Sequence, residues 1–384
     1  MKKLNKKLLA VLVIAALTVC CFAGCQGSGN ASGSGTVKLG LIGPLTGPAA
    51  QYGGAAANGA KLAVQEINAK GGLQFDLNCQ DDTHDAEKSV NAYNTLRDWG
   101  MQLLVGTVTT APCLAVSQKT YEDRIFTLTP SASGSAVTEG KDNVFQICFN
   151  DPNQGTASAR YISENMPGAK VAVIYNNGDA YSTGIYQTFQ AEAASRGMEI
   201  VSVTTFTDTT NDFSVQVSDA KNNGAEVIFL PMYYTPASLI LNYANSIGYA
   251  PTFFGVDGMD GILALEGFDT SLAEGVMLLT PFAADATDDA TVNFVKAYKE
   301  AYGETPNQFA ADGYDCIYAV YQAFTASGLK ANASPEEICE AMIEQFNSMS
   351  FSGLTGAGMT WKNGQVDKAP AAVVIKDGVY VAAK

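Results

Sequence analysis

The chain contains 384 residues, of which 23 are basic and 38 are acidic, and its formal net charge is −15. This length favours two domains, and the acidic balance argues against binding to nucleic acid or to an anionic membrane surface through charge. The chain has a single histidine, His84, and no GxSxG or HExxH motif, which argues against a hydrolase or a metalloprotease. We interpret His84 as a surface residue in the loop before a helix.

The N-terminus predicts a signal peptide over residues 1–24. Residues 1–7 include four lysines, and residues 8–19 are apolar except for Thr18, a run too short to span a bilayer comfortably. The small pair Ala23-Gly24 before Cys25 resembles a bacterial lipobox, whose cysteine is lipidated; the alternative is an ordinary cleaved signal with an incidental cysteine. Residues 25–35 are expected to be a flexible tether, so that the protein would be lipid-anchored to the outer face of the bacterial cell membrane.

Short apolar segments alternate with helical patterns along residues 37–147. The expected strands cover residues 37–42, 74–79, 102–105, 125–128 and 144–147, and apolar residues recur at helical spacing over residues 56–68 and 87–99. Continuous apolar strands that alternate with helices are typical of a parallel sheet covered on both faces.

A second series of the same kind follows. Its expected strands cover residues 170–175, 199–205, 227–230, 252–255 and 275–279, with helices over residues 182–196, 214–223 and 236–247. Further helices are expected over residues 291–302, 307–327 and 335–348, and short strands over residues 359–361, 371–375 and 380–383, with a turn at residues 362–364. We therefore predict an α/β protein with two doubly wound parallel-sheet lobes. Lobe 1 would comprise residues 36–150 and 282–355, and lobe 2 would comprise residues 151–281 and 356–384.

The cysteines after Cys25 predict neither a metal site nor a redox site. They are widely spaced and form no CxxC pair. We predict no metal and no cofactor, and a disulfide between two of these cysteines stays open.

The strand ends of lobe 1 predict a site for a carboxylate. Ligands of open parallel sheets bind beyond the carboxyl ends of the strands. Small and hydroxyl residues fill the loops at residues 43–48, 106–112 and 129–134, which contain no Arg or Lys. Each loop precedes a helix and so offers backbone N–H groups to an anion, whereas the missing GxxxxGK[ST] and GxGxxG motifs argue against a polyphosphate. The alternative is that these loops are ordinary caps and turns.

The strand ends of lobe 2 have different chemistry. The loops at residues 176–182, 231–234 and 255–260 include Tyr181, Tyr233 and Asp257. Tyrosine offers an apolar face and a hydroxyl, and a carboxylate between glycines can approach a small cation closely. A free amino acid carries both charges, and a cleft between two lobes could pair both of them at once.

The chain resembles the leucine/isoleucine/valine-type solute-binding proteins of ABC importers from Thr36 to its end. The resemblance is carried by residues 38–47 (KLGLIGPLTG) with Tyr52-Gly53, 63–72 (AVQEINAKGG), Asp81-Asp82, 106–110 (GTVTT), 129–133 (TPSAS) and 307–315 (NQFAADGYD). It implies a type I periplasmic-binding fold, in which two lobes joined by a multi-stranded hinge close on a ligand.

The resemblance also implies a set of ligand-binding residues. Thr110 and the backbone of Ser131 would hold the substrate carboxylate, Ser133 would contact both ends of the amino-acid head, and Asp257 would face the ammonium. The family usually has serine where Thr110 stands, and Tyr233-Tyr234 is more polar than an aliphatic side chain requires, so the side chain of the ligand stays open. Tyr181 and Tyr233 would line the wall of the second lobe, and Tyr52 and Phe309 would flank the side-chain region. Thr109 and Ala132 complete the predicted set of ligand-binding residues.

The implied function is capture of an amino acid, branched-chain or similar, and its delivery to the permease subunits of an ABC importer. The protein would be a monomer and not an enzyme. The alternatives are a ligand sensor for a membrane signalling partner and a binder of another solute, such as an amide or a small carboxylate. An enzyme on the same fold is disfavoured by the missing catalytic motifs.

Overall fold

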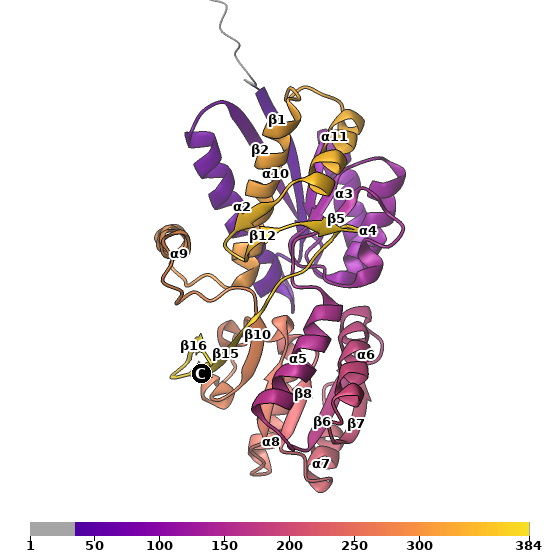
Figure 1. Cartoon of the computed structure of the whole chain (residues 1–384), viewed down its shortest axis with the longest axis vertical. Coiled ribbons are helices and arrows are strands. Elements are labelled where there is room, and N and C mark those ends of the chain that lie inside the picture. The colour runs from indigo at the N-terminus through magenta and orange to yellow at the C-terminus, as the bar shows by residue number, and fades with distance from the viewer. Residues whose placement is uncertain (1–34, 384) are drawn as a thin grey trace, which may run out of the picture. The chain divides into compact units, whose positions relative to one another are not determined.

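The computed structural model describes residues 35–383, which fall within a compact unit of residues 33–384. The predicted signal peptide, the lipidation site Cys25 and the tether up to residue 34 lie outside the described residues. The unit contains two large sheets, each covered by helices (Figure 1). We call the sheet of strands β1–β5 with its helices the N-lobe, and the sheet of strands β6–β10, β15 and β16 with its helices the C-lobe.

The N-lobe is built on a parallel five-stranded sheet in the order β2-β1-β3-β4-β5. In β1, Val37, Leu39 and Leu41 pack toward α2, α10 and α11, whereas Ile42 packs toward α3 and α4 on the other face. Both faces are apolar because both are covered, as the continuous apolar strands predicted. The elements are β1 (Gly35–Gly43), α2 (Ala50–Ala69), β2 (Leu73–Asp81), α3 (Ala86–Trp99), β3 (Leu103–Gly106), α4 (Thr110–Glu122), β4 (Thr127–Thr129), β5 (Val144–Gln146), α10 (Gln308–Ser327) and α11 (Pro335–Ser348).

Helix α2 begins at Ala50, earlier than the predicted residue 56, and so contains Tyr52 in its first turn. A β-carbon at Gly53 would lie only 2.2 Å from the carbonyl oxygen of Pro44. Glycine therefore lets this first turn approach the loop after β1, which the apolar periodicity of the helix did not reveal.

Helices α2 and α10 lie side by side on one face of the N-lobe sheet (Figure 1). A β-carbon at Gly59 would lie 1.9 Å from the carbonyl oxygen of Ala310, and one at Gly313 would lie 2.2 Å from that of Ala56. The two glycines thus permit a close backbone approach. This approach holds the start of α10, including Phe309, against α2.

The C-lobe has a seven-stranded sheet in the order β16-β15-β10-β9-β8-β6-β7, in which β15 and β16 are antiparallel additions. Val171 and Val173 pack toward α5 and α6, and Ala172 and Ile174 pack toward α7 and α8. Its elements are α5 (Asp151–Asn165), β6 (Val171–Asn176), α6 (Ala180–Ser195), β7 (Ile200–Phe206), α7 (Ser214–Asn222), β8 (Val227–Leu230), α8 (Tyr234–Ser246), β9 (Thr252–Gly255), β10 (Met277–Thr280), β15 (Ala371–Lys376) and β16 (Val379–Ala382). Every strand predicted over residues 37–279 is present.

The assignment of residues 356–366 to lobe 2 is wrong. Strands β11 (Phe351–Gly353), β12 (Gly356–Met359), β13 (Trp361–Lys362) and β14 (Gln365–Val366) precede β15, and Met359, Trp361 and Val366 pack in the N-lobe core. The Trp361 Nε1–H donates to the carbonyl oxygen of Gln146 in β5 at 2.7 Å. Burial of the indole against N-lobe side chains decides the position of this segment, and the other lobe boundaries stay a prediction.

The chain passes between the two sheets at residues 147–150, after β5, at residues 281–288, after β10, and at residues 367–370, before β15. Helix α9 (Asp289–Tyr302) follows the passage at residues 281–288. Among residues 35–383, no helix combines the length and the apolar character needed to cross a membrane.

Candidate ligand-binding site

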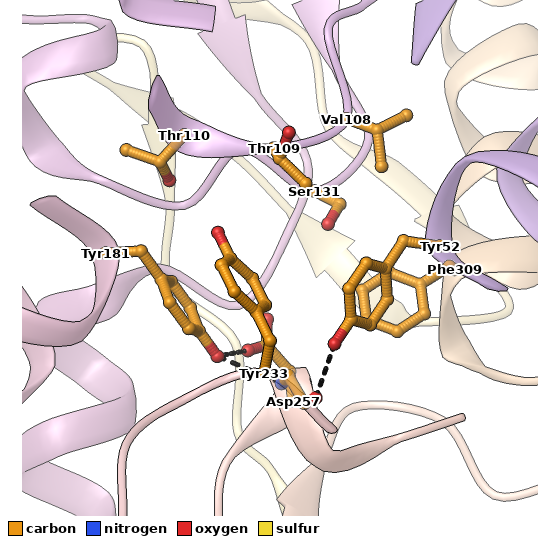
Figure 2. A pocket seen from close by; sticks show the side chains of 10 residues that line it. Tyr52, Val108, Thr109, Thr110, Ser131, Tyr181, Tyr233, Asp257 and Phe309 are labelled. Atoms are coloured by element: carbon orange, nitrogen blue, oxygen red, sulfur yellow. Dashed lines mark hydrogen bonds between the residues drawn. The ribbon is translucent and has the colours of Figure 1, made fainter. Parts of the chain in front are cut away.

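A narrow pocket lies between strand ends of the two lobes (Figure 2). All residues that the sequence assigned to the site line it, except Ala132 and Ser133. The lining residues are Tyr52, Val108, Thr109, Thr110, Ser131 and Phe309 from the N-lobe, and Tyr181, Tyr233, Asp257 and Gly258 from the C-lobe.

Ala132 and Ser133 lie behind the pocket wall. Ala132 is fully buried in a small apolar cluster with Cys113 and Val137. The carbonyl oxygen of Ser133 accepts from the N–H of Asp151 at 3.1 Å, and its buried hydroxyl has no hydrogen-bond partner among residues 35–383. The contact of Ser133 with both ends of an amino acid stays a prediction.

Tyr52 connects the two lobes across the pocket. Its hydroxyl donates to the carbonyl oxygen of Gly258 at 2.6 Å and accepts from the N–H of Tyr234 at 3.2 Å. The ring meets Phe309 edge to face, with centroids 4.8 Å apart. These contacts join α2 and α10 of the N-lobe to the strand-end loops of the C-lobe, so the pocket is closed on this side.

The C-lobe wall combines a carboxylate with stacked tyrosine rings. Tyr181 stacks on Tyr233, with centroids 4.7 Å apart and planes 8° from parallel. The Tyr181 hydroxyl donates to Oδ1 of Asp257 and accepts from the N–H of Gly258 at 2.9 Å (Figure 2). Tyr181 lies in the first turn of α6, and Asp257 opens a short 3₁₀ turn after β9, so both follow directly from buried strands.

Asp257 is buried, and burial raises the pKa of its carboxyl to about 7, although the hydrogen bond from Tyr181 lowers it. Desolvation penalises the ionised form of an acid that has no cationic partner. A cation placed beside Asp257 would remove this penalty.

The N-lobe wall is formed by the N-terminus of α4. Thr110 is the first residue of this helix and Thr109 is its N-cap, yet the Thr109 side chain makes no capping hydrogen bond. In the part of the chain that the structure describes, the N–H groups of Thr110 and Ala111 donate no hydrogen bond. Such N–H groups at the positive end of a helix dipole suit an anion.

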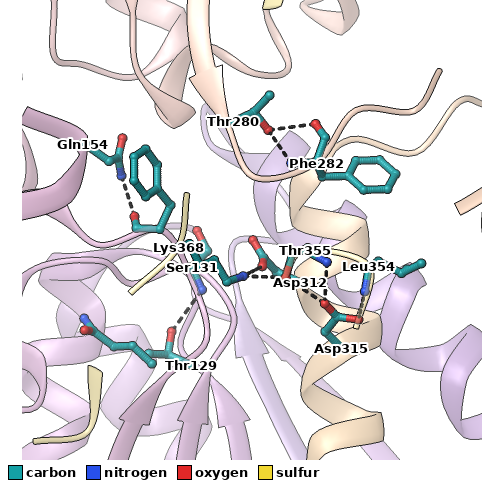
Figure 3. A network of polar contacts seen from close by, with 12 residues as sticks. Thr129, Ser131, Gln154, Thr280, Phe282, Asp312, Asp315, Leu354, Thr355 and Lys368 are labelled. Carbon is teal, nitrogen blue, oxygen red and sulfur yellow. Dashed lines mark hydrogen bonds and ion pairs between the residues drawn. The ribbon is translucent and has the colours of Figure 1, made fainter. Parts of the chain in front are cut away.

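Ser131 lines the pocket through its side chain, whereas its backbone is engaged elsewhere. The N–H groups of Ser131 and Ala132 donate to Oγ1 of Thr129, at 3.3 and 2.9 Å (Figure 3). Thr129 in turn donates to the carbonyl oxygen of Thr107 at 2.6 Å. The predicted contact of the Ser131 N–H with a carboxylate therefore competes with Thr129.

A buried ion pair holds the last passage between the lobes (Figure 3). Lys368 Nζ lies 2.9 Å from Oδ1 of Asp312, and both side chains are almost completely buried. Lys368 also donates to Oγ1 of Thr355, and Asp315 accepts from the N–H groups of Leu354 and Thr355, both at 2.9 Å. The network attaches the passage at residues 367–370 to α10.

Asp151 is a residue near the site that sequence reasoning missed. It is the first residue of α5, is 1% exposed, and neither of its carboxylate oxygens has a hydrogen-bond partner among the described residues. Burial raises the pKa of Asp151 well above its ordinary value. A β-carbon at Gly134 would lie 3.5 Å from Oδ2 of Asp151 and 3.6 Å from Oγ1 of Thr110, so the carboxylate is near the pocket wall. From the sequence, we predict only that lobe 2 begins at Asp151.

The interpretation of His84 as a surface residue is wrong. The side chain is partly buried, and its Nδ1 lies 2.9 Å from Oγ1 of Thr109. The ring also meets Tyr233 edge to face, with centroids 5.3 Å apart. Burial lowers the pKa of His84, although Asp208 and Asp85 raise it. The partners come from β3–α4 and β8–α8, so no local pattern could have revealed this burial.

The charges around the pocket are one-sided. Asp257 lines it and Asp151 lies behind its wall, whereas no Arg or Lys is among the lining residues. In residues 35–383, no cluster of three His, Cys, Asp or Glu side chains could hold a metal ion. The described cysteines are not paired in disulfides: Cys79, Cys113, Cys148, Cys316 and Cys339.

Comparison with protein families gives one match that covers most of the chain. Residues 36–379 match the family described as periplasmic binding protein. This stretch includes both sheets and every residue that lines the pocket.

Individual relatives agree with this family match. The chain is 34% identical over 227 residues to Leu/Ile/Val-binding protein homolog 3 of Brucella melitensis, covering 58% of this chain and 61% of that protein. It is 28% identical over 316 residues to Leu/Ile/Val-binding protein BraC3 of Rhizobium johnstonii, covering 81% of this chain and 80% of the relative. The first of these alignments thus spans less than two thirds of the relative.

A solved structure shares the fold over nearly the whole described chain. It is the branched-chain amino acid transporter substrate-binding protein LivJ of Streptococcus pneumoniae in complex with isoleucine, at 26% identity and a TM-score of 0.82. The match covers 91% of this chain and 99% of LivJ. The type I periplasmic-binding fold with two doubly wound lobes, predicted from the sequence, is confirmed.

Proposed function

Since the chain belongs to the periplasmic binding protein family, we propose that it captures a free amino acid between its lobes and delivers it to an ABC importer. The observation that carries this proposal is the pairing of two unlike walls across one small pocket. Unpartnered helix N–H groups and hydroxyls lie on the N-lobe side, and the buried carboxylate of Asp257 lies on the C-lobe side. This arrangement suits a zwitterion, with its carboxylate at α4 and its ammonium at Asp257.

The assigned residues follow from the same arrangement. Thr110 and Ser131 would serve the carboxylate, Asp257 the ammonium, and Tyr181 and Tyr233 the wall beside it. Tyr52, Val108 and Phe309 offer apolar surface to the ligand's side chain, and the relatives named for leucine, isoleucine and valine favour an aliphatic one. Asp151 lies behind the wall near Thr110, and burial keeps the pKa of its carboxyl well above the ordinary value.

Capture would proceed by closure of the two lobes about their hinge. A ligand favours the closed form only through contacts that it makes better there. The Tyr52 bridge to Gly258 and Tyr234 is available only when the lobes meet. The permease subunits of the importer would then recognise the closed form of a monomer.

The protein would work outside the cytoplasm as a lipoprotein, tethered by Cys25, and would release its ligand unchanged. Membership of a periplasmic binding family supports the extracytoplasmic location. The signal peptide and the lipid rest on residues 1–35 of the sequence. A matched pair of chains, wild type and Cys25→Ser, would test the anchor by membrane fractionation, in which only the wild type should sediment with membranes.

Calorimetry with the twenty amino acids tests the proposed function. We expect one-to-one binding of at least one aliphatic amino acid, with no chemical change in the ligand recovered after denaturation. Absence of heat with the whole panel, or binding only of an amide or a simple carboxylate, would contradict an amino acid as the ligand. Conversion of the ligand would contradict a binding protein.

A further inference from the structure

His84 lies behind the pocket wall and touches both lobes. Its Nδ1 is 2.9 Å from Oγ1 of Thr109 in the N-lobe, and its ring packs edge to face on Tyr233 of the C-lobe. Both partners line the pocket, whereas His84 does not. The imidazole is therefore placed to influence a ligand through these two side chains.

The loop that carries His84 is held in an uncommon conformation. Thr83 and His84 have φ values of 49° and 65°, in the left-handed region that residues other than glycine rarely adopt. The N–H of Thr83 donates to Oδ1 of Asp81, and that of His84 donates to Oδ1 of Asp82, both at 2.9 Å. These bonds stabilise the loop in the conformation that directs the imidazole toward Thr109.

The Thr109 hydroxyl does not make the hydrogen bond that is usual for a threonine at the N-cap. A threonine at the N-cap normally accepts from the N–H of the second or third helical residue. Thr109 has the extended backbone of an N-cap, with φ −111° and ψ 151°, but makes no such bond. The third residue is Pro112, which has no N–H, so only the N–H of Ala111 could be capped.

We propose that His84 is a positioning residue that keeps the first-turn N–H groups of α4 open to the ligand's carboxylate by holding the Thr109 hydroxyl away from them. This inference rests on the proposed function, because it concerns the same carboxylate site. Without the imidazole, the hydroxyl is able to turn about χ1 and cap Ala111. The ligand then has to displace this cap before its carboxylate can bind.

The pair His84→Asn and His84→Gly isolates the hydrogen bond. Both residues tolerate a φ of 65°, and both remove the ring that touches Tyr233. The side-chain amide of asparagine reaches the position of Nδ1 and can hold Thr109, whereas glycine cannot. With L-leucine as the probe in calorimetry, we expect H84G to bind about five- to tenfold more weakly than H84N, in proportion to one N-cap hydrogen bond.

The same two His84 variants are then compared in a protein that also carries Thr109→Val. Valine has the shape of threonine but no hydroxyl with which to cap Ala111. In the T109V background, H84G and H84N should bind L-leucine within about twofold of each other. An equal loss in both backgrounds would assign His84 a structural role only and would overturn the proposal.

The failure of this inference is distinguishable from failure of the proposed function. If the wild type binds no amino acid of the panel, the proposed function fails; if it binds but H84G equals H84N, only the role of His84 fails. Because the chain has one histidine, ¹⁵N NMR of the imidazole reports the hydrogen bond without any ligand. T109V should shift the Nδ1 resonance, and an unchanged resonance would contradict the hydrogen bond itself.

Discussion

The two walls of the pocket have opposite chemistry. The N-lobe wall offers backbone N–H groups and the hydroxyls of Thr110 and Ser131, whereas the C-lobe wall offers the carboxylate of Asp257 behind two stacked tyrosines. Burying an N–H group or a hydroxyl costs less than burying an ionised carboxylate that has no cationic partner, and this cost raises the pKa of Asp257 to about 7 although Tyr181 donates to it. Changing the carboxylate of the C-lobe wall should therefore weaken ligand binding more than removing a hydroxyl of the N-lobe wall does.

Replacement of Asp257 by Asn should have the largest effect on binding. The ammonium loses its counter-charge, and we expect the affinity for L-leucine to fall by about a hundredfold or more, measured by calorimetry. Asp260→Asn is the matched control, because Asp260 is also buried but does not line the pocket. Its affinity should stay within about threefold of the wild type, and a comparable loss in both variants would refute the special role of Asp257.

Lowering the pH should weaken ligand binding, as the replacement of Asp257 by Asn does. Only ionised Asp257 neutralises an ammonium, and its raised pKa of about 7 means that the proton must first leave. The affinity for L-leucine should reach its maximum above about pH 8 and fall by about tenfold per pH unit below about pH 7. Calorimetric titrations between pH 8.5 and 5.5 measure this slope, and D257N should remove most of it; a pH-independent wild type would argue against an ionised partner.

Tyr52→Phe tests the bridge between the two walls. The variant keeps the ring that packs on Phe309 but loses the hydroxyl that bonds Gly258 and Tyr234. We expect about tenfold weaker binding of L-leucine, through faster dissociation in stopped-flow measurements, because the closed form loses these bonds. The exposed Tyr121→Phe serves as control, and equal dissociation rates for the two variants would speak against the bridge.

Thr110→Val should have the smallest effect. It removes one neutral hydroxyl from the N-lobe wall and leaves the N–H groups of α4 in place, so we expect about three- to fivefold weaker binding by calorimetry. Thr95→Val, at an exposed position of α3, is the control. A loss of affinity as large as that of D257N would contradict the expectation that the C-lobe wall contributes more to ligand binding than the N-lobe wall.

Much of the candidate site was predictable because it lies at strand ends. Tyr181, Tyr233 and Asp257 each follow a buried apolar strand within a few residues, and parallel strands bring their carboxyl ends to one edge. The same local rule located Thr110 and Ser131 but could not separate the lining residues from Ala132 and Ser133, which lie behind them. Side-chain direction in these loops depends on packing with β5 and α5.

Other features depended on partners that are distant in the chain. His84 and Thr109 are 25 residues apart, and the burial of His84 also requires Tyr233 of the other lobe. Trp361 joins the N-lobe through the carbonyl of Gln146, which corrected the boundary of lobe 2. Asp151 reads as a helix start at a domain break, and its unpartnered carboxylate emerges only when Ser133 and Gly184 surround it.

The amino-acid sequence alone determined the two sheets, their helices and the chemistry at the strand ends, because strand burial and helix capping act between residues that are close in the chain. Only the tertiary structure decided which of those side chains face the pocket, that the Thr109 hydroxyl is held by His84, and that a second buried acid lies nearby. These features arise where distant segments exclude water from one another, and the energy of a buried polar group is set by whichever partner the fold brings to it.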